Sequence, residues 1–315
     1  MLRRPHTVIG TTVSAASLFC YATPPAKWIS KDMGASFLGA LLPSLLMNVY
    51  ITGLNQIIDV DIDKINKPFL PIAAGVLSVP AATAVVLGSL VGALLSAQRA
   101  LPPLRWTLLL SALVGTLYSM PPVRLKKFPF FAALCILVVR GAFVNIGFYH
   151  QARVAVMHDS PPSSVSAALR RHPESVGVAF FFAVFGLAIA ILKDIPDITG
   201  DKSFDIVSFS VSQGAQAMLN IGWRMLTGLL WSTAIVCTSR NIRRTQFEQK
   251  GEIGRQLLRL VLPSMLLWLG WRVRTNALGA LREDSTVNMK NVYSFYMYVW
   301  KVFYACYALL PMLQF

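Results

Sequence analysis

Long apolar runs constrain the fold of this chain more than any other feature of its sequence. We place such runs at 7–21, 35–58, 78–98, 106–120, 130–149, 177–192, 223–238, 257–271 and 292–313. An isolated apolar segment in lipid satisfies its backbone hydrogen bonds only as a helix, and about 20 residues cross the hydrocarbon core. The sequence therefore predicts an all-α, polytopic membrane protein with about nine transmembrane helices, organised as a single domain over residues 1–315.

The composition agrees with a lipid bilayer as the surroundings of this chain. Hydrophobic residues make up 55% of it and charged residues 14%, whereas about 25% charged residues is usual in soluble domains. The net charge is +15, but the 29 basic residues are spread over short segments between the apolar runs. That distribution is typical of membrane proteins and argues against a nucleic-acid partner. Basic segments fall on both sides, so they predict neither the orientation nor the oligomeric state.

Half of the negative charge lies in two short segments. Asp59, Asp61, Asp63, Asp194, Asp197, Asp201 and Asp205 make seven of the 14 acidic residues, and each group directly follows an apolar run. Counting spans places both groups at the same end of the helix bundle. If the helical register continues past the run, Asn55, Asp59 and Asp63 share one face while Asp61 points away from it.

Two simple interpretations of the first acidic segment fail. A calcium-binding EF-hand loop starting at Asp59 needs Gly at its sixth position and Glu at its twelfth, where this chain has Lys64 and Leu70. Surface carboxylates that merely solvate a helix end are also unsatisfactory. Negative charge at a helix C-terminus opposes the helix dipole, so two such groups are unfavourable unless cations compensate them.

A third interpretation is a magnesium site that binds a diphosphate. Mg²⁺ prefers hard oxygen ligands and often bridges carboxylates to phosphates. The predicted ligands are Asp59, Asp63, Asp194, Asp197 and Asp201, assisted by Asn55. The cations able to neutralise a diphosphate are Lys67, Arg124, Lys126, Lys193 and Lys202. For Lys126 an ordinary interfacial anchor is the alternative. Metal ligands beside this many cations indicate a diphosphate ester as substrate.

At these residues the chain resembles the UbiA-type membrane prenyltransferases. Their two aspartate-rich motifs have the forms NxxxDxxxD and DxxxD, found here at Asn55/Asp59/Asp63 and at Asp197/Asp201. Further phrases that resemble the homogentisate prenyltransferase branch are 4–11, 66–71, 118–126, 139–145, 193–197 and 295–301. The resemblance covers nearly the whole chain, and the phytyltransferases of tocopherol synthesis are the nearer match, with the solanesyltransferases of plastoquinone synthesis a close second.

The resemblance implies a fold, a reaction and a compartment. The fold is a bundle around a central cavity with a lateral opening to lipid. The reaction is Mg²⁺-dependent transfer of a prenyl group, phytyl favoured, from its diphosphate to homogentisate with decarboxylation, which gives a 2-methyl-6-prenyl-1,4-benzoquinol. Catalysis would rest on Asn55, Asp59, Asp63, Asp197, Asp201 and Arg124. A plastid membrane is implied by the family resemblance alone, because no targeting peptide is readable before the first apolar run.

Three polar residues inside the apolar runs are further candidates for substrate contacts. Arg140 and Asn145 would hold the homogentisate carboxylate or a ring hydroxyl, because a cation within a span indicates a functional site. Their alternative is an interhelical hydrogen bond. Tyr118 either lines the path of the allylic cation or belongs to the aromatic belt of the membrane interface.

A protein of another class remains an alternative to the enzyme. In a cation-coupled transporter, carboxylates within the membrane would bind the driving ion. Such acids are expected near the centres of the spans, whereas these lie at the ends of spans, beside Pro68 and Pro196. The positions of the acids therefore favour the enzyme.

Overall fold

The computed structural model describes residues 5–204, 206–247, 253–281 and 287–314, so Arg4 and Asp205 lie outside the described residues. In these ranges the chain is almost entirely helical, and the strand-like geometry is limited to one isolated bridge between Leu281 and Val287. The long helices are α1 (Pro5–Ala22), α2 (Lys31–Ile58), α4 (Val79–Arg99), α5 (Pro102–Ser119), α9 (Glu174–Lys193), α12 (Ala215–Phe247), α13 (Ile253–Leu278) and α14 (Met289–Leu309). The all-α prediction is confirmed.

One further long helix is continuous but changes from α-helical to π-helical hydrogen bonding near its middle. It consists of α6 (Pro129–Ile136), a π-helical segment η3 (Leu137–Phe143) and α7 (Val144–Val156). π-Helical turns are rare and frequently mark functional sites. Here the π-helical turn carries Arg140.

The predicted spans all fall on helices, but their number is not settled by the helices alone. By length and composition, four helices in the described ranges could cross a membrane: 31–58, 79–99, 129–156 and 174–193. The remaining predicted spans lie within α1, α5, α12, α13 and α14 with η4 (Leu310–Gln314). Nine crossings therefore stay a prediction, while an integral membrane protein is supported by the apolar helices.

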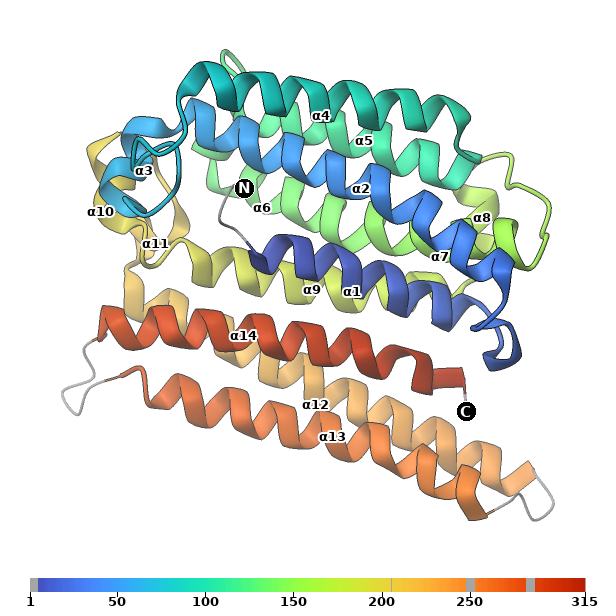
Figure 1. Ribbon diagram of the computed structural model, residues 1–315. Helices are drawn as coiled ribbons and strands as arrows, with labels where there is room; N and C mark the ends of the chain where they lie inside the picture. The colour runs from blue at the N-terminus through green and yellow to red at the C-terminus, as the bar shows by residue number, and fades with distance from the viewer. Residues whose placement is uncertain (1–4, 205, 248–252, 282–286, 315) are drawn as a thin grey trace.

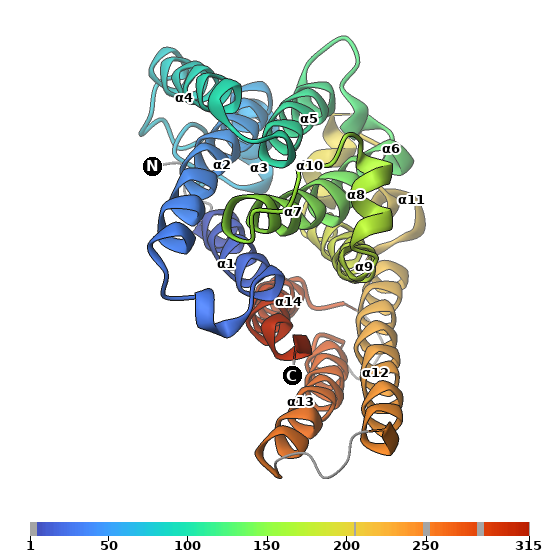
Figure 2. The same ribbon diagram turned by 90° about the vertical axis from the view of Figure 1, so that its right-hand side faces the viewer.

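The long helices run side by side, and short helices close one end of the bundle (Figures 1 and 2). These are α3 (Val60–Asn66), α10 (Ile198–Ser203) and α11 (Phe209–Gln213), which we call the cap. Helix α3 contacts α10, and α10 contacts α11. At the opposite end the chain forms α8 (Val165–Arg171). Both acidic segments thus lie at one end, as the count of spans predicted.

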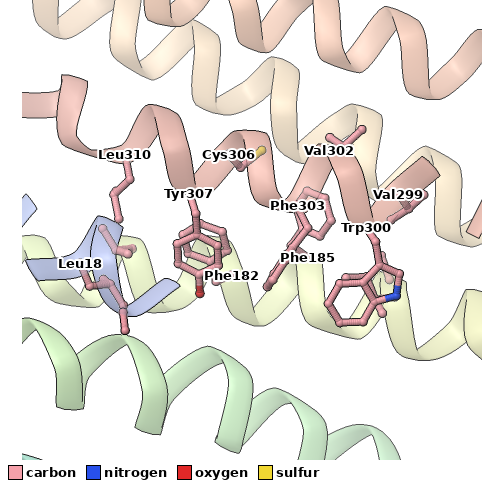
Figure 3. Packing of buried hydrophobic residues seen from close by; sticks show 14 of the residues in the cluster. Leu18, Phe182, Phe185, Val299, Trp300, Val302, Phe303, Cys306, Tyr307 and Leu310 are labelled. Carbon is pink, nitrogen blue, oxygen red and sulfur yellow. The ribbon is translucent and has the colours of Figure 1, made fainter. Parts of the chain in front are cut away.

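Aromatic side chains fill the contact between α9 and α14 (Figure 3). The rings of Phe182 and Tyr307 stack with centroids 3.6 Å apart at 5°, and Phe303 meets Tyr307 edge-on at 5.0 Å. Such aromatic pairs contribute about 0.5–1.5 kcal/mol beyond the burial of their area. On its other side α9 approaches η3 closely, since a Cβ on Gly141 would lie 2.3 Å from the Cβ of Ala183. Small residues therefore set the position of the π-helical turn.

Candidate active site

The first acidic motif keeps its helical register across the junction of α2 and α3. Asp59, at the junction, donates its N–H to Asn55 O at 3.0 Å, and the N–H groups of Asp63 and Lys67 donate to Asp59 O and Asp63 O at 2.8 Å each. These bonds between residues four apart hold the three side chains of the motif on one face. Asp59 and Asp63 are buried, whereas Asp61 is exposed and pairs with Lys64 at 2.9 Å. The prediction that Asp61 points away is confirmed.

The second acidic motif begins where α9 ends. Asp194 follows its last residue, Asp197 directly precedes α10, and Asp201 lies in the first turn of α10, with its N–H donating to Asp197 O at 3.0 Å. Asp197 and Asp201 are both buried. Lys202 is exposed, because the next residue on a helix is rotated by about 100° from its neighbour.

A hydrogen bond that the sequence did not predict joins the two motifs. Gly200 donates its N–H to Asn66 Oδ1 at 2.9 Å, across 134 residues of chain. A Cβ on Gly200 would lie 2.4 Å from that same Oδ1, so only glycine permits this approach of α10 to α3. Beside it, Lys67 forms an ion pair with Asp197. The resemblance of residues 66–71 to the family singles out the segment that contains Asn66, but it does not indicate that Gly200 is the hydrogen-bond partner of Asn66.

Asp59 accepts hydrogen bonds from Asn55 of its own motif and from two cations of one distant segment. Arg124 donates to its Oδ1 at 2.9 Å, and Lys126 and Asn55 donate to its Oδ2, Asn55 at 2.9 Å. Arg124 and Lys126 belong to the segment around η2 (Leu125–Lys127), where Arg124 adopts a left-handed backbone with φ 38°. That conformation is costly for a residue other than glycine and is found mostly at functional sites. The pKa of Lys126 is lowered by burial, which the Asp59 charge partly opposes.

These groups surround a cavity of about 250 Å³, which we call the cap cavity. Its lining includes Asn55, Asp59, Asp63, Asn66, Lys67, Tyr118, Lys126, Lys193, Asp194, Asp197, Asp201, His6 and Tyr296. Every acidic residue predicted to bind metal thus faces one space, together with three of the predicted cations. In the described part of the chain, Arg124 reaches that space only through Asp59, and Lys202 is not part of its lining.

The carboxylates of the second motif repel one another. The pKa of Asp201 is raised to about 7 by burial and by the charges of Asp197 and Asp194. The pKa of Asp194 is also raised, chiefly by burial, although the Lys193 ammonium at 3.2 Å opposes the shift. Such a cluster is stabilised by an added cation. Its all-oxygen donor set suits Mg²⁺ rather than zinc or copper.

The carboxylates are at present held by lysine and arginine rather than gathered around one point. Among the described residues, no group of three or more His, Cys, Asp or Glu side chains is close enough to hold a metal ion. The ion pairs of Asp59 with Arg124 and of Asp197 with Lys67 account for this arrangement. The donor set therefore fits magnesium, and the ion pairs must exchange partners to admit it.

Two further cavities extend from the cap cavity into the bundle. A middle cavity of about 200 Å³ shares His6, Asn55, Tyr118, Lys193 and Tyr296 with the cap cavity. A deep cavity of about 160 Å³ shares Ile51, Thr52, Val139 and Arg140 with the middle one. The linings move steadily along α1, α2 and α14, so the three cavities follow one path away from the acidic residues.

This arrangement can bind an anion with a metal at one end and receive an apolar or aromatic group behind it. The model of the UbiA prenyltransferase family matches residues 8–243, a stretch that contains both acidic motifs and most of the cavity lining. The chain belongs to the UbiA prenyltransferase family. It is accordingly a membrane-embedded prenyltransferase, and the transporter alternative is set aside.

Named UbiA relatives cover nearly all of this chain. It is 36% identical to homogentisate phytyltransferase 1 of Arabidopsis thaliana, over 99% of this chain and 74% of the relative. It is also 36% identical to homogentisate phytyltransferase of Synechocystis, over 98% of this chain and 92% of the relative. A homogentisate solanesyltransferase of Arabidopsis thaliana is 33% identical over 98% of this chain and 75% of the relative.

A solved UbiA structure shares the fold. It is a UbiA homolog from Archaeoglobus fulgidus bound to GPP and Mg²⁺, with a TM-score of 0.61, 14% sequence identity and 98% of each chain covered. The likeness concerns the arrangement of helices. A divalent metal is therefore present in a protein of this fold.

Of the three polar residues predicted to contact substrate from within the apolar runs, Tyr118 and Arg140 line the cavities and Asn145 does not. Tyr118, near the end of α5, lines both the cap and the middle cavity. Arg140 lines the middle and deep cavities, and its guanidinium lies 4.8 Å above the ring of Trp300. Tyr118 thus lines the cavities, and its role beside an allylic cation stays a prediction.

Asn145 requires a correction, because its amide is engaged within the protein. Its Nδ2 donates to the carbonyl oxygens of Arg140 and Gly141 at 2.7 and 2.8 Å, and its Oδ1 accepts from Tyr307 OH at 2.9 Å. The residue is 1% exposed. The interhelical alternative is the one that the structure supports: Asn145 secures the π-helical turn to α14 rather than contacting a substrate.

Proposed function

We propose that this chain transfers a prenyl group from a prenyl diphosphate to homogentisate, with loss of carbon dioxide, giving a 2-methyl-6-prenyl-1,4-benzoquinol. The observation that carries the proposal is the single cavity in which both acidic motifs and three lysines meet, opening toward an apolar path. The names of the relatives support homogentisate as the acceptor. A plastid membrane is proposed because the Arabidopsis relatives are named chloroplastic.

The diphosphate would bind at the cap with Mg²⁺. The residues that would hold the metal are Asp59, Asp63, Asp194, Asp197 and Asp201, with Asn55 orienting Asp59 through the hydrogen bond of 2.9 Å. Bound Mg²⁺ supplies positive charge that stabilises the diphosphate as a leaving group. The cap helices α3 and α10 cover the site and limit the access of water to a reactive cation.

The cations of the cap would bind the oxygens of the diphosphate. Lys67 and Lys126 are paired with Asp197 and Asp59, so they are already held within reach of the cavity. Lys193 stands where the cap cavity passes into the middle cavity. Together they stabilise the negative charge that develops on the bridging oxygen as the allylic C–O bond breaks. Arg124 acts through Asp59, whose orientation it fixes.

The allylic cation would form in the middle cavity. Tyr118, Tyr296 and Trp300 line this space, and aromatic faces stabilise cations by about 0.5–2 kcal/mol each. The electron-rich ring of homogentisate attacks the allylic carbon, and loss of the ring proton restores aromaticity. The side-chain carboxylate leaves as carbon dioxide, and the methylene carbon takes up a proton to become the methyl group. The chain's part in this step is to hold the ring close to the cation and to exclude water.

Phytyl diphosphate is the donor that we favour over geranylgeranyl and solanesyl diphosphates. The two phytyltransferases are 36% identical to this chain, compared with 33% for the solanesyltransferase. A competition assay tests both donor and acceptor. Purified protein in lipid nanodiscs receives Mg²⁺, homogentisate and equal amounts of the three donors, and the products are identified by mass. We expect the phytyl product to dominate.

The outcomes of this assay separate the parts of the proposal. If the solanesyl or geranylgeranyl product dominates, the proposed donor is wrong, but the proposed reaction class still holds. Release of diphosphate only when another aromatic acid replaces homogentisate overturns the acceptor. No Mg²⁺-dependent release with any of the donors contradicts the proposed reaction.

A further inference from the structure

Arg140 is a cation inside the bundle for which the structure provides no anion. In the described part of the chain, its guanidinium has no hydrogen-bond or ion-pair partner. It makes a cation–π contact with Trp300, 4.8 Å from the centre of the ring. The cap differs, since Arg124 and Lys126 each pair with Asp59. A cation within a membrane bundle is costly unless an anion accompanies it. Arg140 therefore indicates an anionic ligand at the boundary of the middle and deep cavities.

The deep cavity beneath Arg140 carries several hydroxyl groups among its apolar residues. Besides Arg140 and Tyr307, its polar lining consists of Thr11, Ser14, Ser44, Asn48, Thr52, Thr107 and Ser111. Most of these hydroxyls donate to a backbone carbonyl of their own helix, as Ser44 does to Ala40 O and Thr52 to Asn48 O, both at 2.7 Å. A hydroxyl whose proton is so engaged retains only acceptor capacity. The lining can therefore receive hydrogen bonds from a ligand that carries hydroxyl donors.

Ser111 departs from this pattern. It is 6% exposed and lines the deep cavity, yet its hydroxyl makes no hydrogen bond with the residues that the structure describes. Ser111 is thus a second group, independent of Arg140 and on another helix, that lacks a partner where a ligand could supply one.

The size of the deep cavity limits what it can hold. At about 160 Å³ it is similar to an engineered cavity of about 150 Å³ in another protein, which binds one benzene molecule. One substituted aromatic ring fits this space. The cavity lies a short way along α2 from the metal site, since Asp59 and Thr52 are seven residues, or about 10 Å, apart. That interval leaves room for a diphosphate and the allylic carbon between them.

We propose that the deep cavity, with Arg140 at its mouth and Ser111 in its wall, is the acceptor subsite for a monocyclic hydroxylated aromatic carboxylate. The carboxylate pairs with the guanidinium of Arg140, and a ring hydroxyl bonds to Ser111. The identification of this acid as homogentisate rests on the proposed function. The ring then meets the allylic carbon in the middle cavity, which Arg140 also lines.

The test for Arg140 compares two ligands that differ only in charge. Binding of homogentisate and of 2,5-dihydroxyphenylacetamide is measured by calorimetry on the full-length protein in nanodiscs without donor. We expect the unaltered protein to prefer homogentisate by about tenfold or more, and Arg140→Gln to reduce this preference to near unity. Arg224→Gln is the matched control, because Arg224 lies 5.5 Å from the ring of Trp223, outside the three cavities.

Ser111 is tested with ligands that differ in their ring hydroxyls. Homogentisate is compared with phenylacetate, which has neither hydroxyl. We expect Ser111→Ala to reduce the preference for homogentisate by roughly threefold to tenfold. Ser89→Ala, which removes a buried hydroxyl outside the three cavities, leaves it unchanged.

Failure of the subsite and failure of the proposed function give different results. An unaltered protein that binds homogentisate, together with an Arg140→Gln variant that discriminates against the amide equally well, overturns the subsite alone. The same holds if Arg140→Gln raises the KM of the prenyl donor and leaves that of homogentisate unchanged. An unaltered protein that binds no homogentisate at all overturns the proposed function.

Discussion

The cap and the deep cavity both carry cations, but these cations form ion pairs with protein carboxylates only at the cap, as far as the described residues show. At the cap, Lys67, Arg124 and Lys126 form ion pairs with two of the aspartates that would bind a metal. Where the middle and deep cavities meet, the guanidinium of Arg140 lies over the ring of Trp300 and has no anionic partner among the residues that the structure describes. The cap can exchange protein partners for ligands at nearly constant charge. In the proposed subsite, the charge of Arg140 is balanced only when an anionic ligand binds. The free-energy cost of the unpaired cation is therefore present in the ligand-free protein.

The largest effect that distinguishes the regions is expected from the loss of a cap carboxylate. Asp197→Ala removes a metal ligand and leaves Lys67 without its anion. We expect kcat/KM to fall by about 10³-fold or more, measured as diphosphate release with saturating Mg²⁺. Asp61→Ala is the control, because Asp61 is exposed and pairs with Lys64 outside the cap cavity. The activity of this variant should stay within about twofold of the unaltered protein. Equal activity of the two variants would show that the cap does not hold the metal.

A smaller effect is expected from separating the two halves of the cap. In Gly200→Ala the new Cβ would meet Asn66 Oδ1 at 2.4 Å, which forces α10 away from α3. We expect activity to fall by roughly ten- to a hundredfold, since displacement of positioned groups by about 1 Å has such an effect. At Gly177, within α9, an added Cβ meets nothing within 4 Å. Gly177→Ala should keep full activity, and a similar loss there would count against the cap.

The affinity of the cap for metal should depend on pH. The pKa of Asp201 is raised to about 7, so the carboxyl is mostly protonated at pH 6 and mostly ionised at pH 8. Because Mg²⁺ binds the ionised form, its apparent affinity should rise by roughly tenfold over that interval. Calorimetric titration at several pH values measures it. Asp201→Asn should flatten the profile, while an unchanged slope in this variant would assign the titration to another group.

The smallest effect concerns thermal stability without ligands. Arg124→Gln breaks an ion pair with the buried Asp59 and should lower the free energy of unfolding by about 1–3 kcal/mol. Arg140→Gln removes a cation that has no anionic partner in the described ranges, so the melting temperature in detergent should stay the same or rise. A large loss of stability in Arg140→Gln would indicate that the guanidinium has a structural role.

Much of the fold could be predicted because apolar runs in lipid have only one way to satisfy their backbone. The face shared by Asn55, Asp59 and Asp63 also followed from local spacing, since the helical hydrogen bonds persist through Asp59. The π-helical turn could not be predicted from the sequence. It depends on contacts of Gly141 with Ala183 and of Asn145 with Tyr307, which join residues distant in the sequence.

The composition of the site was easier to predict than its geometry. Types of side chain and their spacing indicated carboxylates and cations around a diphosphate. They did not indicate that Arg124 would hold Asp59, that Asn66 would accept from Gly200, or that Lys202 would turn outward. The hydroxyls of the deep cavity were visible as polar interruptions of the apolar runs. Sequence periodicity did not reveal which of them converge on one space.

The hydrogen bond between Asn66 and Gly200 also sets an order for biosynthesis. Its partners are 134 residues apart, and a ribosome adds about 5–20 residues per second, so the first motif waits roughly 7–27 seconds for the second. During that interval α2 and α3 are made, but the carboxylates of Asp59 and Asp63 have no opposite wall. A nascent chain that stops before α10 therefore lacks half of the proposed metal site, so the cap is completed only late in membrane insertion.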